Sequence, residues 1–380
     1  MDPRWAVLGW LRDYSAHRRQ RICTTRGVLP VGTVRRSDSG VSVGGVMVCG
    51  SRNCPMCGPR LYARNRDDIR QCVRAWTEGY GGAVLLGTFT AGHTLGDTLA
   101  DSLAITSKAW GRVTGGKGWL TARRRFGIHH WVRVFEEKFS DETGWHSHVH
   151  YLLFLEKASD DIARELLLDL FRSWSSAVKS AGRSVSVRAQ DLRVVRGVDS
   201  DRVLGEYFTK QMDASSSQSS DRIALEMSGR DTKFGGGSLT PAEVLLLAVA
   251  VGEQWAGLWR EFELATHKRR VIAFSRGLRD FAGVGDEVPD AEVSAQSADA
   301  EGTVELLVRG KHLRDVLSRK NRATFVRVVF EQGGPAAVVW LAERGLTGWL
   351  PELGEFAELD SAEFDPDVEG VPEFSGALPW

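Results

Sequence analysis

The spacing of hydrophobic residues predicts strands and helices in alternation through the middle of the chain. Two apolar stretches, 129–139 and 147–155, flank a short polar segment that ends in Gly144, and this pattern indicates a β-hairpin. Because hairpins dominate over parallel crossovers, we expect an α+β fold with an antiparallel sheet flanked by helices. The pattern predicts further strands at 83–90 and 184–195, and helices at 96–112, 160–181, 199–212 and 240–266.

Composition divides the 380 residues into five segments. The first, residues 1–75, is basic and contains every cysteine. The second, residues 76–280, contains the predicted sheet. The third, residues 281–303, is an acidic linker with six acids and no base. The fourth, residues 304–350, is expected to be a small helical unit, and the last, residues 351–380, with nine acids and no base, a disordered tail.

The net charge of zero hides an asymmetry along the chain. Residues 281–380 hold 8 basic and 19 acidic side chains, which leaves residues 1–280 with 41 basic and 30 acidic ones. A basic body favours a polyanionic partner such as nucleic acid, and solvated surface charge is the equal alternative. No apolar run reaches the roughly 20 residues that span a bilayer, and the N-terminus has no signal-peptide pattern. We expect a cytoplasmic protein without a membrane partner.

All five cysteines precede residue 73, and their odd number argues against a disulfide framework. The turn from Cys54 to Cys57 matches a zinc knuckle, and Cys23 with Cys49 would complete a tetrahedral Zn²⁺ site. A redox pair and a set of buried, unliganded thiols are the alternatives. Cys72 lies in a predicted helix and is assigned to the core.

Three histidines at alternate positions give the densest chemical signal. On a strand, His146, His148 and His150 point to one face, where neighbouring imidazoles can reach one cation. Glu136 and Glu137 lie across the predicted hairpin and point to opposite faces, so one of them can join the histidines. We favour Glu136, and the alternative is that both are solvated. Such a His/His/Glu set suits Mn²⁺ or Mg²⁺ acting as a Lewis acid.

Tyr207 and Lys210 share one face of a predicted helix by their i,i+3 spacing. A phenol becomes a nucleophile when a polarised phosphate and a nearby ammonium stabilise the developing charge. The pair alone is weak, since most such pairs are ordinary surface. Its weight comes from the histidines about 57 residues upstream.

Together these motifs resemble the HUH endonuclease superfamily, and more narrowly the plasmid rolling-circle replication initiators (Rep proteins) of Gram-positive bacteria, in the actinobacterial style. The family's His-hydrophobic-His motif is matched by His148, Val149 and His150. The resemblance covers roughly residues 23–280 and extends weakly to 350. It rests on Gly87-Thr88-Phe89-Thr90, Val134-Phe135-Glu136, residues 144–150, Glu206-Tyr207-Phe208-Thr209-Lys210 and the cysteine-rich N-terminal region.

The resemblance implies an HUH-like sheet on which His148, His150 and Glu136 hold a catalytic Mn²⁺ or Mg²⁺. Tyr207 would attack the scissile phosphate and form a 5′-phosphotyrosine with a free 3′-hydroxyl, and Lys210 would contact the phosphate. It implies as partners the plasmid double-strand origin, a single-stranded nick site, and host helicase and polymerase. A structural Zn²⁺ on the four cysteines would help position the DNA.

Three other readings remain open at this level. Another HUH strand transferase, a transposase or relaxase, shares the histidines, but relaxases more often place the tyrosine near the N-terminus. A non-catalytic zinc-finger DNA-binding protein would need the cysteines without Tyr207. A cupin-like metal oxygenase would need a run of short strands that the sequence lacks.

The chain departs from the Rep pattern at one position. Some Rep relatives carry an acid four positions before the tyrosine, where this chain has Val203.

Overall fold

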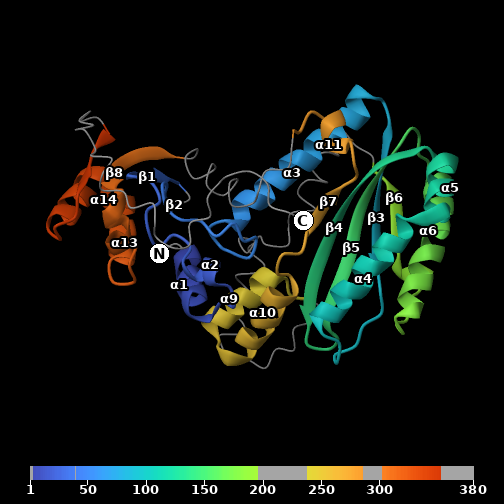
Figure 1. Ribbon diagram of the computed structural model, residues 1–380, viewed down its shortest axis with the longest axis horizontal. Coiled ribbons are helices and arrows are strands. Elements are labelled where there is room, and N and C mark those ends of the chain that lie inside the picture. The colour runs from blue at the N-terminus through green and yellow to red at the C-terminus, as the bar shows by residue number, and fades with distance from the viewer. Residues whose placement is uncertain (1–2, 39, 196–237, 286–301, 352–380) are drawn as a thin grey trace. The chain divides into compact units, whose positions relative to one another are not determined.

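The computed structural model forms two compact units and describes residues 3–38, 40–195, 238–285 and 302–351 (Figure 1). The larger unit comprises residues 2–21 and 49–294, and the smaller one comprises residues 22–48 and the chain from 295 onward. Within the described residues, no helix combines the length and apolar character that crossing a membrane requires.

The larger unit is built on a five-stranded antiparallel sheet with the order β6-β3-β5-β4-β7. The two longest strands, β4 and β5, form the predicted hairpin, and β5 begins at Gly144, whose φ of +78° is unfavourable for residues with a side chain. The predicted α+β fold with antiparallel pairing is confirmed. The strands are β3 (Ala83–Thr90), β4 (Ile128–Ser140), β5 (Gly144–Leu155), β6 (Asp191–Val194) and β7 (Ile272–Phe274).

Both faces of this sheet are buried over most of its length. Alternate side chains of the hairpin enter different cores, because successive residues of a strand point to opposite faces. One core contains Phe135, Phe139, Val149, Tyr151 and Leu153. The other contains Val132, Val134, Leu152 and Phe154.

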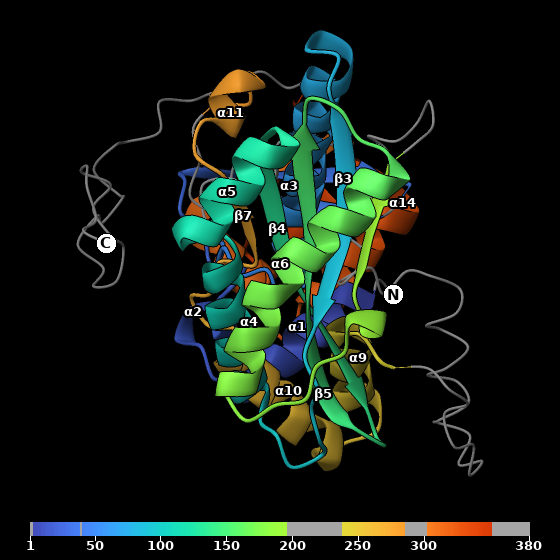
Figure 2. The same cartoon turned by 90° about the vertical axis from the view of Figure 1, so that its right-hand side faces the viewer.

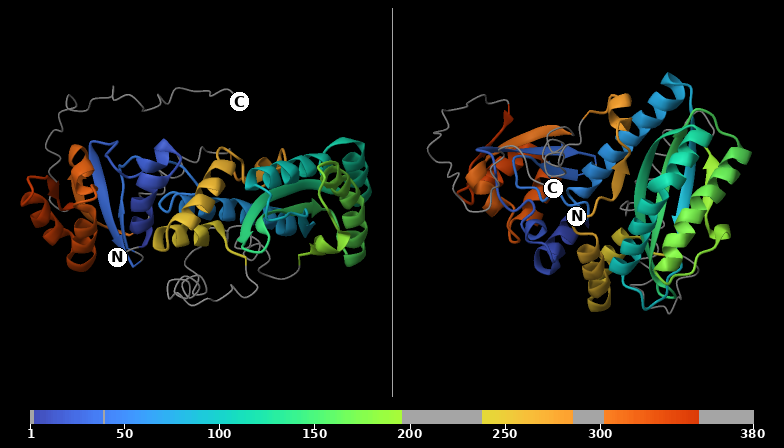
Figure 3. Two further views of the ribbon diagram at one scale, coloured as in Figure 1. Left: turned by 90° about the horizontal axis from the view of Figure 1, so that it is seen from below. Right: turned by 45° about the vertical axis from the view of Figure 1, so that its right-hand side comes forward.

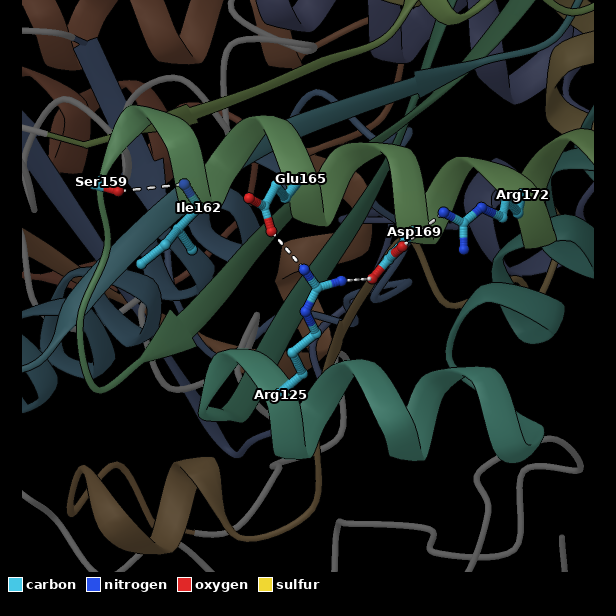
Figure 4. A network of polar contacts seen from close by, with 6 residues as sticks. All are labelled: Arg125, Ser159, Ile162, Glu165, Asp169 and Arg172. Atoms are coloured by element: carbon cyan, nitrogen blue, oxygen red, sulfur yellow. Dashed lines mark hydrogen bonds and ion pairs between the residues drawn. The ribbon is translucent and has the colours of Figure 1, made fainter.

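Helices cover the two faces unequally (Figure 2). Helices α4 (Leu99–Val113), α5 (Gly116–Phe126) and α6 (Asp160–Ser180) lie on one face, and α3 (Gly58–Arg74) lies on the other. Thr98 and Ser159 cap α4 and α6 by accepting hydrogen bonds from backbone N–H groups of the first turn. On the outer side, Arg125 of α5 joins Glu165 and Asp169 of α6 at 2.6 and 3.1 Å, and Arg172 also contacts Asp169 (Figure 4).

The predicted helix over 240–266 is wrong as a single element. It forms two helices, α9 (Pro241–Ala250) and α10 (Glu253–Ala265), separated by Gly252 at φ 122° and ψ −148°. Thr240 and Glu243 form a capping box at the start of α9. The other elements that the structure describes in this unit are α1 (Pro3–Tyr14), α2 (Arg18–Arg21), the π-helix η1 (Ala75–Gly79), the 3₁₀ helix η2 (Val187–Ala189) and α11 (Leu278–Phe281).

The smaller unit joins segments from opposite ends of the sequence. Its antiparallel sheet has the order β2-β1-β8-β9, so that β8 lies beside β1 although more than 260 residues separate them (Figure 3). The predicted helices of 304–350 are present, and α14 is interrupted at Gly333, but the segment opens with a strand instead of standing alone as a helical unit. Its elements are β1 (Val31–Ser37), β2 (Gly40–Val43), β8 (Thr303–Arg309), η5 (Gly310–His312), α13 (Leu313–Val316), α14 (Arg322–Ala342) and β9 (Gly348–Trp349).

Candidate functional site

Strand β5 presents the three histidines on one face of the sheet, as its alternation predicts. The ring centroids of His146 and His148 lie 3.8 Å apart, and those of His148 and His150 lie 5.9 Å apart with nearly parallel planes. Tyr151 points to the other face, where its side chain is fully buried in the core. Burial raises the pKa of this phenol well above its ordinary value, which makes it a poor nucleophile.

Glu136 is the glutamate that faces the histidines. It lies directly across the hairpin from His148, and its Oε2 is 2.7 Å from Nε2 of His150. Glu137 points to the opposite face and is almost completely buried. The geometry therefore brings together Glu136, His148 and His150.

The ionisation of these groups suits a cation site. Burial opposes ionisation of Glu136, but its hydrogen bond to His150 and the charges of His150, Lys138 and His148 outweigh this and lower its pKa to about 2. Burial lowers the pKa of His148 to about 3 and that of His146 to about 4, and repulsion from neighbouring imidazoles adds to the effect. An ionised Glu136 carboxylate beside the neutral imidazole of His148 is the form in which these two groups bind metal.

Two threonines of β3 orient the imidazoles, a role that their positions in the sequence do not reveal. Thr88 Oγ1 lies 2.9 Å from Nδ1 of His150, and Thr90 Oγ1 lies 2.6 Å from Nε2 of His146. Because Thr88 occupies Nδ1, the other ring nitrogen of His150 is directed at Glu136. The sequence shows the two threonines at alternate positions of the strand motif 87–90. Which histidines they contact depends on strand register, which the sequence does not give.

His93 is a further residue that the sequence did not single out. Its ring stacks on that of His146 with centroids 4.0 Å apart, so that four imidazoles lie in a row above the end of the sheet. Burial lowers the pKa of His93. The neutral form lets the rings of His93, His146 and His148 lie close together without mutual repulsion.

The residues present fit a divalent cation. Nε2 of His150 and the Glu136 carboxylate point at each other, and a hydrogen bond on Nδ1 is the usual way in which a ligating histidine is held. Tyr207 and Lys210 lie outside the described residues, and their roles stay predictions.

The predicted zinc ligands Cys23, Cys49, Cys54 and Cys57 come together as one buried cluster. Their sulfur atoms all lie within 4.8 Å of one another, and Sγ of Cys49 is 3.7 Å from Sγ of Cys57. Tetrahedral zinc with Zn–S bonds of 2.3 Å separates its sulfurs by roughly 3.8 Å. The cluster could therefore hold a structural metal such as zinc.

Backbone hydrogen bonds and a glycine stabilise the turn that carries the cysteines of the cluster. The N–H of Ser51 donates to Sγ of Cys49 at 3.4 Å, and the N–H of Gly58 donates to the carbonyl of Cys54 at 2.8 Å. A Cβ at Gly58 would lie 2.4 Å from the carbonyl oxygen of Arg52, so this position requires glycine. Cys72 is separate from the cluster and lies in the core, as expected.

Comparison with protein families gives a match to the model of the replication protein family Rep_1 over residues 41–305, more than half of the chain. The chain belongs to the Rep_1 family. The resemblance to plasmid Rep proteins seen in the sequence is thereby confirmed at the level of the family, and replication is the process in which this Rep_1 chain acts.

Two curated relatives support this assignment. The Rep_1 chain is 27% identical to a protein described as "Protein rep" from Streptomyces lividans, over 71% of this chain and 72% of the relative. It is 29% identical to a protein described as "Neomycin resistance protein" from Streptomyces cyanogenus, over 32% and 33% of the two chains. No solved structure gives a significant match. Both relatives come from actinobacteria, in agreement with the predicted type.

Proposed function

We propose that this Rep_1 protein initiates plasmid rolling-circle replication by binding the origin and by nicking and rejoining one DNA strand. The arrangement of Thr88, His150 and Glu136, with His148 alongside, carries the proposal. Hydrogen bonds bring these side chains together from three neighbouring strands, and imidazole nitrogens with a carboxylate form a ligand set that suits a divalent cation. The family match supports replication, and the site supports the chemistry.

In the proposed reaction the phenol oxygen of Tyr207 forms a bond to phosphorus, and the bond from phosphorus to the 3′-oxygen breaks. The phenol proton ends on the departing 3′-oxygen, so that a 5′-phosphotyrosine and a free 3′-hydroxyl are formed. Lys210 would contact the phosphate and reduce the charge that develops there. The phosphotyrosine retains the energy of the broken phosphodiester, so rejoining needs no nucleotide cofactor.

His148, His150 and Glu136 would hold the Mn²⁺ or Mg²⁺. A bound cation supplies Lewis-acid polarisation of a non-bridging phosphate oxygen. The protein's contribution is to fix its ligands: Thr88 sets the ring of His150, and the β-hairpin sets Glu136 opposite His148. The free 3′-hydroxyl would serve host polymerase as a primer, with host helicase unwinding the duplex.

A nicking assay tests this proposal. Supercoiled plasmid carrying the origin is incubated with the protein and Mn²⁺, and open circles with protein on the 5′ end are expected. His148→Ala and His150→Ala should abolish nicking while duplex binding persists, and EDTA should act in the same way. Nicking that survives in EDTA would contradict the metal-dependent chemistry, and the absence of any nicking would favour a non-catalytic DNA-binding protein.

We also propose that the four cysteines bind one structural Zn²⁺. Cys54→Ser should release the metal and lower the thermal unfolding temperature, because structural zinc binding is coupled to folding. Cys72→Ser, which changes a buried thiol outside the cluster, is the matched control and should retain zinc. Purified protein that is fully folded yet free of zinc by elemental analysis would refute the site.

A further inference from the structure

A cavity of about 290 Å³ lies in the larger unit and is lined by residues of α2, α3, β4 and α10 and of the segments next to them. Glu137 lines its inner wall, and Tyr62 of α3 and Phe262 of α10 contribute aromatic side chains. The nicking chemistry proposed above uses none of these residues. A preformed cavity of this size is at the lower limit of the range, roughly 300–1,000 Å³, that binds small organic groups.

The charges around the cavity favour an anion. Four permanent cations line it, from three separate parts of the chain, against two carboxyl groups. Three of the four are exposed at its rim. The cations are Arg19, Arg52, Lys268 and Arg269, and the carboxyl groups are Glu137 and Glu263.

One of the two carboxyl groups is already engaged within the protein. Glu263 is fully buried and accepts hydrogen bonds from Oγ of Ser15 at 2.5 Å and from the N–H of Ala16 at 2.6 Å. These bonds fix the wall that carries His17, whose ring stacks on that of His267 with centroids 4.0 Å apart. The wall is therefore organised before any ligand arrives.

Lys268 has a backbone conformation that lysine rarely adopts. Its φ is +55°, in the left-handed region, just beyond the C-terminus of α10. Glycine is the usual residue at such a position, and a side chain there costs roughly 1–2 kcal/mol. Lys268 has this unfavourable backbone conformation and is exposed at the rim of a cationic cavity. The combination indicates a functional role for its ammonium group.

We propose that this cavity holds one unpaired nucleotide of single-stranded DNA, with the phosphate on the cationic rim and the base against the inner wall. A duplex keeps its bases stacked inside, so an unpaired nucleotide is the form of DNA that can enter a cavity. Aromatic side chains among cations are typical of sites for single strands. The identity of the ligand as DNA rests on the proposed function; the cavity and its charge do not.

The test measures binding without chemistry. Fluorescence anisotropy follows a labelled oligothymidylate binding to the full chain in EDTA over a range of salt concentrations. Lys268→Gly removes the ammonium and suits the backbone, so the fold should be retained. We expect about fivefold weaker binding at roughly 0.1 M salt, and a salt slope smaller by about 0.7, the loss of one phosphate contact to a single strand. Lys157→Gly, at an exposed loop lysine that does not line the cavity, should leave both the affinity and the salt slope unchanged.

A second variant and a crosslink locate the contact. Arg269→Gln should weaken binding in the same way, and an oligonucleotide carrying 5-iodouracil should crosslink to Tyr62 or to residues 262–269. Any one of three results would overturn the proposal. These are an unchanged affinity and salt slope in both variants, crosslinks to other residues, and an equal loss of affinity for a duplex. If Lys268→Gly loses affinity although the wild type never nicks, the proposed function fails and the cavity site stands. If nicking is found and the variants bind normally, the cavity site fails alone.

Discussion

His150 is hydrogen-bonded at both ring nitrogens, by Thr88 on one side and by Glu136 on the other. With Glu136 ionised, Nε2–H donates to the carboxylate and the Thr88 hydroxyl donates to Nδ1. When Nε2 is a metal ligand, the proton must sit on Nδ1, and the same hydroxyl oxygen can accept it. Threonine thus supports both protonation patterns without any movement of the backbone.

Thr88→Val tests this positioning role, because it keeps the shape of the side chain and removes the hydroxyl. We expect nicking to fall about 10–100-fold, with a higher Mn²⁺ concentration required for half-maximal rate, because the loss of an outer hydrogen bond weakens metal affinity. Thr90→Val is the matched control: its hydroxyl contacts His146, outside the proposed ligand set, so the Mn²⁺ requirement should stay near wild type. An unchanged Mn²⁺ requirement in Thr88→Val would contradict the role.

Glu137 gives a prediction for pH-dependent stability. Burial, followed by the charge of Glu136, raises its pKa to about 8. The folded state therefore keeps a proton that the unfolded chain releases above pH 4.5, and stability due to this group falls as pH rises from 4.5 towards 8. Glu137→Gln should unfold at a higher temperature than the wild type at pH 8 and at a similar one at pH 4.5, measured in EDTA. A difference independent of pH would show that Glu137 is ionised in the fold.

The sequence left the choice between Glu136 and Glu137 open in part, and the reason is physical. Alternation along a strand puts neighbouring side chains on opposite faces but does not say which face is which. The face is decided by strand register and by packing: Phe135 and Phe139 enter the core below α4–α6, and Glu137 lies between them in the chain. The contact between the Thr88 hydroxyl and the His150 ring could not be predicted for the same reason, because it also depends on strand register and packing.

At the scale of elements, the hairpin was predictable because its polar turn and alternating strands are local signals. The broken helix was not, because α9 and α10 both carry apolar side chains at helical spacing and only Val251 and Gly252 separate them. Glycine is tolerated inside helices, so its presence does not predict a break. Strand β8 was missed because its partner, β1, is more than 260 residues away in the sequence.

Gly252→Ala should destabilise the larger unit by about 1–3 kcal/mol, since φ 122° with ψ −148° is a conformation for glycine. Gly257→Ala is a matched control inside α10, where an added Cβ meets nothing within 4 Å; it should stabilise the protein by about 0.5–1 kcal/mol. Urea unfolding measures both. Equal effects of the two substitutions would contradict the assigned break between the helices.

At the scale of the whole molecule, charge is separated along the sequence. The nine acids of residues 351–380 have no base among them, whereas residues 1–280 have a surplus of 11 positive charges. Deleting 351–380 should tighten non-specific duplex binding at low salt and leave the unfolding temperature of the core unchanged. Gel shifts with a plasmid fragment lacking the origin measure this, and weaker or unchanged binding would show that the acidic segment does not oppose DNA binding.

The central claim is that Tyr207 becomes covalently joined to the 5′ end of the nicked strand. Peptide mapping of the protein–DNA adduct, formed with origin DNA and Mn²⁺, measures this most directly. We predict attachment at Tyr207 and complete loss of the adduct in Tyr207→Phe, with origin binding retained. Tyr151, the tyrosine next to His150, is fully buried on the opposite face of the sheet and should carry no DNA. An adduct at Tyr151, or one that persists in Tyr207→Phe, would contradict the account.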